Sequence, residues 1–120
     1  MANNVKKVPF PDFLLRTPCE IKLNTGNVNE DGDKEVYKVS KVGDDDLKCI
    51  YSEAARRIYD KDGKTVILSG KVIVKGDIAP KLKSISDGVI VINDNEMLIH
   101  KGARPRNPDG TVHHTEFDVI

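Results

Sequence analysis

His113 and His114 are the residues of this sequence best suited to chemistry, because imidazole can bind a metal ion or exchange protons near neutral pH. Adjacent side chains on a β-strand point to opposite faces, so the two rings are not expected to chelate one ion. We expect one ring to pack inward with a hydrogen bond and the other to face solvent or a neighbour. A metal bridged across a subunit interface is the alternative.

Catalytic motifs do not accompany this histidine pair. A hydrolytic triad needs a nucleophile, a base and an orienting group, and the sequence has no Gly-x-Ser-x-Gly string to present a serine. Its glycines do not have the spacing of a Walker or dinucleotide loop. A calcium loop around Asp60 to Gly63 would begin at Ile58 and end at Ser69, where a carboxylate and a bidentate glutamate are required. We therefore expect no enzyme and no cofactor.

Acidic residues cluster in two polar segments, residues 25–33 and residues 43–46. We expect both to be solvated loops. The alternative is an acidic loop that repels DNA passing through a channel. The candidate channel-loop residues are Asn29, Glu30, Asp31, Asp44, Asp45 and Asp46.

Cys19 and Cys49 are the only two cysteines, and no signal peptide precedes them. This pattern predicts free, buried thiols of a protein made in a reducing cytoplasm, since a disulfide framework uses more cysteines. Two thiolates are too few for a zinc site unless subunits share them. The longest wholly apolar run is residues 89–92, so no membrane span is expected.

The balance of acidic and basic residues argues against a protein that binds nucleic acid. Nineteen basic residues face 19 acidic ones over 120 residues, and the chain contains three Phe, three Tyr and no Trp. A single-stranded nucleic-acid binder needs a basic groove with stacking aromatic rings, and neither is present. The length suits one domain with a modest aliphatic core.

Short runs of residues with β-propensity, separated by Gly, Asp and Asn, predict a series of β-strands. Residues 19–24 alternate apolar and polar, which is typical of a half-buried strand. Residues 47–51 and 56–59 are expected to be strands joined through a bent or bulged step at 52–55. We expect seven or eight short strands and an all-β domain, a barrel or sandwich with long loops, over residues 19–120. The other expected strands are 34–42, 64–68, 71–75, 89–92 and 97–101.

Residues 1–18 predict an extended N-terminal arm, because Pro9, Pro11 and Pro18 interrupt regular structure. Phe10 and Phe13 make it unusually apolar for a tail. The arm either folds over its own domain or is donated to a neighbouring subunit.

Asn107-Pro108-Asp109-Gly110 predicts a turn, with Gly110 supplying a positive φ. The β-branched residues after it predict a last strand paired with residues 97–101, tied down to its end. Arg104 and Arg106 flank a proline before the turn; we expect them to be solvated, or to pair with the carboxylates of a partner.

The string from Asn107 to Phe117 resembles the ending of small virion proteins of long-tailed phages and of prophages of Gram-positive bacteria. These are minor capsid or head-closure (stopper) proteins. The similarity continues more loosely back to about Tyr59, and so covers roughly the second half of the chain. It implies a β-barrel that assembles as a homo-oligomeric ring beneath the portal and adaptor, closes the DNA channel with a loop and meets the tail terminator below.

The resemblance also implies a virion protein assembled in the host bacterial cytoplasm, with DNA contact only in passing and no membrane contact. Another head or tail component, such as a tail-completion protein, and a small β-barrel binding module remain alternatives. The candidate subunit or partner interface comprises Phe10, Phe13, Arg104, Arg106, Asn107, Pro108, Asp109, Gly110, His113 and His114.

Overall fold

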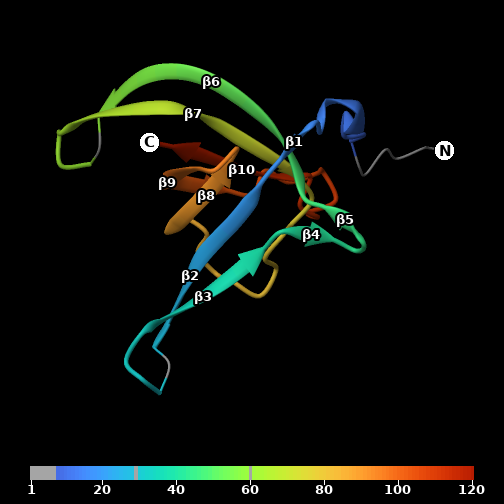
Figure 1. The fold of residues 1–120 in the computed structure, drawn as a ribbon. Coiled ribbons are helices and arrows are strands. Elements are labelled where there is room, and N and C mark those ends of the chain that lie inside the picture. The colour runs from blue at the N-terminus through green and yellow to red at the C-terminus, as the bar shows by residue number, and fades with distance from the viewer. Residues whose placement is uncertain (1–7, 29, 60) are drawn as a thin grey trace.

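Eight strands form one antiparallel sheet in the order β1-β6-β7-β10-β9-β8-β2-β3 (Figure 1). The structure, a computed structural model, describes residues 8–28, 30–59 and 61–120. A 3-10 turn, η1 (Asp12–Leu14), precedes the sheet, and a separate two-stranded ribbon pairs β4 (Lys41–Val42) with β5 (Asp45–Asp46). The sheet strands are β1 (Thr17–Pro18), β2 (Glu20–Val28), β3 (Lys34–Val39), β6 (Lys48–Tyr59), β7 (Thr65–Lys75), β8 (Gly88–Ile92), β9 (Asn95–Ala103) and β10 (His114–Val119).

The all-β prediction is confirmed, but the sheet does not close into a barrel, because its outer strands β1 and β3 do not pair with each other. The sheet folds over on itself in a sandwich-like way. Strand β9 joins the two halves: its first residues pair with β8, and those from Ile99 onward pair with β10. A strand that changes partner along its length is a usual way to turn a corner between packed sheets.

The core lies between the two halves and is aliphatic except for Phe117 and the two cysteines, as the composition predicts. Alternate residues of each strand point inward, as in β10, where Thr115, Phe117 and Val119 are buried. Residues 77–87 pass close over β9, and Ser86 Oγ accepts from the Gly102 amide at 3.0 Å. A Cβ on Gly102 would lie 2.5 Å from the Ile85 carbonyl oxygen, so this close approach requires glycine.

Several strands are longer than predicted. β2 continues to Val28, which leaves 29–33 rather than 25–33 between the strands. β7 runs without a break through Ser69 and Gly70, because β6 pairs with it on both sides of this step. The bulge predicted at residues 52–55 is confirmed: Glu53 pairs with Gly70 and Arg56 with Leu68, so β6 carries one extra residue.

The predicted C-terminal turn is also confirmed. Gly110 has φ +88° and its amide donates to the Asn107 carbonyl at 2.9 Å. Strand β10 pairs with β9 as expected and also with β7, so the last strand lies inside the sheet. The Ile120 amide donates to the Leu98 carbonyl at 2.9 Å, which ties the backbone down to its final residue.

Candidate functional site

The histidine pair lies where β10 begins, and there the two rings meet. Their Nδ1 atoms are 2.7 Å apart and their ring centroids 5.0 Å apart. The prediction that the rings point to opposite faces is wrong, because His113 precedes the strand and does not follow its alternation. Phe10 of the arm lies against both rings, at centroid distances of 5.6 Å and 6.3 Å.

One proton joins the two imidazoles. His113 Nε2 lies 3.3 Å from the Pro9 carbonyl oxygen, so its N–H donates there, and its neutral Nδ1 accepts from His114 Nδ1–H. Burial is the main cause that lowers the pKa of His114; the neighbouring His113 and Lys71 act in the same direction, and Glu116 opposes them. Among the residues that the structure describes, no group of three or more His, Cys, Asp or Glu could hold a metal ion.

The predicted turn residues form a network within the chain. Asn107 is 8% exposed, and its side-chain oxygen accepts from the Val8 amide at 2.8 Å. Its side-chain amide donates to Thr111 Oγ1 at 3.1 Å, and Asp109 accepts from the Thr111 amide at 3.0 Å. The turn thus holds the start of the described arm, while Pro108, Asp109 and Gly110 are exposed at its surface.

Arg104 and Arg106 have different surroundings, although both were expected to be solvated. The Arg104 side chain is 15% exposed and forms an ion pair with Asp77 at 3.2 Å. Its guanidinium also donates to the carbonyls of Ala79 and Leu82, both at 2.7 Å. Arg104 thus fixes the passage over β9 instead of facing solvent, because its planar fork matches several acceptors at once. Arg106 is exposed and donates to the Gly110 carbonyl at 2.8 Å.

The arm follows its own sheet over residues 8–18. Asp12 pairs with Lys75 of β7 at 2.9 Å, and β1 pairs with β6. These contacts favour the arm folding over its own domain. Phe10 packs on the histidines, whereas Phe13 is 71% exposed and contributes nothing to the core. The two phenylalanines therefore have separate roles.

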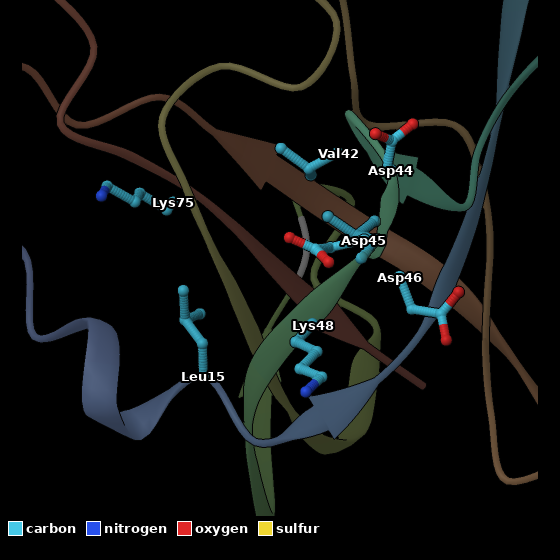
Figure 2. Close-up of a pocket in the computed structure, with 8 residues that line it drawn as sticks. Leu15, Val42, Asp44, Asp45, Asp46, Lys48 and Lys75 are labelled. Carbon is cyan, nitrogen blue, oxygen red and sulfur yellow. The ribbon is translucent and has the colours of Figure 1, made fainter.

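A pocket with a volume of about 660 Å³ lies between the arm and the β4–β5 ribbon (Figure 2). Gly43 and Asp44 form the ribbon's two-residue turn, so the predicted loop at 43–46 is a tight hairpin. The carboxylates of Asp44 and Asp46 point in different directions and do not converge on one point. The lining residues are Leu15, Val42, Asp44, Asp45, Asp46, Leu47, Lys48 and Lys75.

The other acidic candidates lie elsewhere. Glu30 and Asp31 are at the exposed end of the β2–β3 hairpin, and Asn29 lies outside the described residues. The structure does not bring these residues together with Asp44 to Asp46. The two acidic segments therefore stay separate candidates for a channel loop.

The two cysteines are free and buried in the core, as predicted. The hydrogen bond that the Cys19 thiol donates to the Cys49 sulfur, together with burial, raises the pKa of Cys19. Since the thiolate is the reactive form of cysteine, Cys19 is suited to packing and not to nucleophilic chemistry.

Two long hairpins extend beyond the core; the sequence predicts the turn at residues 60–63 that joins strands 56–59 and 64–68, but not that either hairpin protrudes from the body. The β2–β3 hairpin extends over residues 25–37 and the β6–β7 hairpin over residues 54–67, and Figure 1 shows them leaving the body in different directions. Most of their described side chains are exposed, including Val28, Val36, Tyr59 and Ile67. The available signal was the strand propensity that continues on both sides of each polar turn.

No protein-family model, curated protein sequence or solved structure matches this chain. Within the described part of the chain, none of the helices has the length and apolar character needed to cross a membrane.

Proposed function

We propose that this protein is a non-enzymatic structural component of a phage neck, which closes the head after DNA packaging and joins head to tail as one subunit of a ring. The observation that carries the proposal is the pair of long, exposed hairpins on a small β-core. A chain that only had to fold would not need strands that continue past its core. Protruding strands with exposed apolar side chains are typical of surfaces that meet other subunits.

The C-terminal segment supports the same assignment. The string that resembles head-closure proteins forms a turn, a histidine pair and the central strand β10. Residues of this string bind the arm and join the two halves of the sheet, so their contacts stabilise the fold. A ring subunit needs a stable body of this kind to position its contact surfaces.

The two-stranded β4–β5 ribbon is acidic and is suited to line a channel through which DNA passes. Asp44, Asp45 and Asp46 are exposed on the tight β4–β5 turn. Carboxylates repel DNA phosphates, so a ring of such ribbons would keep DNA from adhering to the channel wall. Glu30 and Asp31 on the β2–β3 hairpin are the alternative lining. The balanced charge of the whole chain agrees with DNA contact only in passing.

Electron microscopy of a lysate from a phage or prophage with this gene disrupted tests the proposal. We expect heads that have lost their DNA beside free, complete tails, and restoration of joined particles when the intact gene is supplied in trans. Normal joined virions would remove the neck assignment. Filled heads beside tails of abnormal length or end structure would instead indicate a tail-completion protein.

A further inference from the structure

We infer that the β2–β3 hairpin of one copy docks on the β6–β7 hairpin of a second copy, so that identical subunits associate head to tail. The inference specifies the subunit contact of the proposed ring and in that sense rests on the proposed function. It is argued from three properties of the hairpins: their charge, their unpaired edges and their exposed apolar side chains.

The two hairpins carry opposite charge. Residues 25–37 contain four acidic residues and one basic residue, whereas residues 54–67 contain four basic and two acidic residues. On the described part of the β6–β7 hairpin, Arg57 and Lys61 are exposed. On the β2–β3 hairpin, Glu30 and Glu35 are exposed. Complementary potentials favour contact between unlike hairpins, and repulsion disfavours contact between like ones.

The two hairpins also hold the two unpaired edges of the main sheet. Among the residues that the structure describes, strand β3 pairs only with β2, and β6 pairs on its outer side only through Lys48 and Cys49 with β1. The rest of β6 to Tyr59 therefore presents backbone N–H and C=O groups along an open edge. Such an edge readily accepts a strand from another chain.

Exposed apolar side chains lie beside each edge. Val36 and Tyr37 are 48% and 41% exposed on β3, and Tyr59 and Ile67 are 73% and 58% exposed on the other hairpin. Burying these groups against each other would add a hydrophobic contribution to the strand pairing and the charge attraction.

The positions of the hairpins make the contact intermolecular. They come from opposite ends of the strand order and leave the body at well-separated places (Figure 1). One chain therefore cannot pair its own hairpins without unfolding. Because two different surfaces meet, the interface is heterologous, and repeated use of it gives a closed ring or an open filament.

Mutual rescue by opposite charge reversals tests this contact. The first variant carries Glu30→Lys and Glu35→Lys, and the second carries Arg57→Glu and Lys61→Glu. We expect sedimentation velocity at low salt to show that wild-type protein associates as its concentration rises. Each variant alone should remain monomeric, with at least a tenfold weaker self-association, and an equal mixture should associate again.

A control pair separates this contact from general charge attraction. Lys81→Glu with Lys101→Glu, and Asp94→Lys with Glu96→Lys, make the same charge changes at exposed positions outside both hairpins. Each control variant alone should associate like the wild type. Wild-type protein that stays monomeric up to millimolar concentration would overturn the inference. So would control variants that each lose association alone and regain it when mixed, as the hairpin variants are expected to do.

A loop-shortened variant addresses the strand edge directly. Replacing residues 58–66 by Asn-Gly keeps Arg57 opposite Ile67 across a two-residue turn, the geometry that this dipeptide favours. We expect a folded monomer by circular dichroism and loss of self-association. A shortened protein that associates like the wild type would exclude the β6–β7 hairpin as the docking surface. Self-association is measured on purified protein, so it can fail or succeed independently of the lysate experiment.

Discussion

At the scale of single residues, the two arginines of the C-terminal approach differ most in what their side chains contact. Arg104 donates to carbonyls and to a carboxylate beneath the passage 77–87, whereas Arg106 contacts one carbonyl at the surface. Sequence alone does not separate them, since both flank Pro105 and only the fold of a distant segment supplies the acceptors.

Arg104→Lys should lower the free energy of unfolding by about 1.5–3 kcal/mol, because one ammonium cannot reach the acceptors that the planar fork joins. Urea unfolding followed by circular dichroism measures the loss. Arg106→Lys is the matched control and should stay within about 0.5 kcal/mol of wild type, as expected for an exposed site. Equal losses in the two variants would contradict the role given to Arg104.

The histidine pair predicts a dependence of stability on pH. The folded state lowers the pKa of His114 below its ordinary 6.5, mainly through burial, with His113 and Lys71 adding to this and Glu116 opposing it. The unfolded chain therefore binds the proton more readily. The contribution to stability is fully present above pH 6.5 and is lost as the pH falls through 6.5 towards the lowered value.

Urea midpoints measured at pH 8 and pH 5.5 should therefore show lower stability at the acid end. His114→Gln should reduce this difference, whereas His100→Gln, at the third histidine, should leave it in place. A His114→Gln protein with the full wild-type pH dependence would show that other groups are responsible.

At the scale of elements, the turns followed the sequence more closely than the strand ends did. Gly110 and Gly63 both have the positive φ that their turns require, because local residue types decide a turn. Strand length depends on a partner elsewhere in the chain, which is why the continuation of β2, β6 and β7 could not be foreseen. The bulge in β6 was predictable, since Ser52 to Ala55 lack β-propensity between two strand-forming runs.

Gly110→Val should destabilise the protein by about 1–2 kcal/mol, because a β-branched residue is strained at φ +88°. Thermal unfolding would show the change. Lys81→Val introduces the same side chain at an exposed position outside the left-handed region and serves as the control. Unchanged stability of the Gly110 variant would mean that this turn relaxes without cost.

At the scale of the whole molecule, the site was harder to predict than the fold. The all-β class follows from the spacing of turns and β-branched residues. The meeting of Phe10 with His113, and of Asp12 with Lys75, joins segments from the two ends of the described chain. No local pattern encodes such contacts. The opposite charges of the two hairpins are visible in the sequence, but their separation in space is not.

Removing residues 1–15 should leave a folded domain, because the described residues of this segment contain no buried side chain. Stability should fall by about 1–2 kcal/mol through the loss of the Val8–Asn107 hydrogen bond and the exposure of the histidine rings. Complementation of a gene-disrupted phage measures assembly, which we expect to weaken. A truncated protein that fails to fold would show that the arm belongs to the core.

The position of β10 also governs the order in which this protein can fold. Among the described residues, strands β7 and β9 do not pair with each other; each pairs with β10, which follows both of them in the chain. During synthesis, the edges of β7 and β9 that pair with β10 therefore remain without a partner strand until residue 119 has been made. Pairing over such long sequence separations is slow. Aggregation of nascent chains should therefore be most sensitive to changes in β10, even those that leave the finished protein stable.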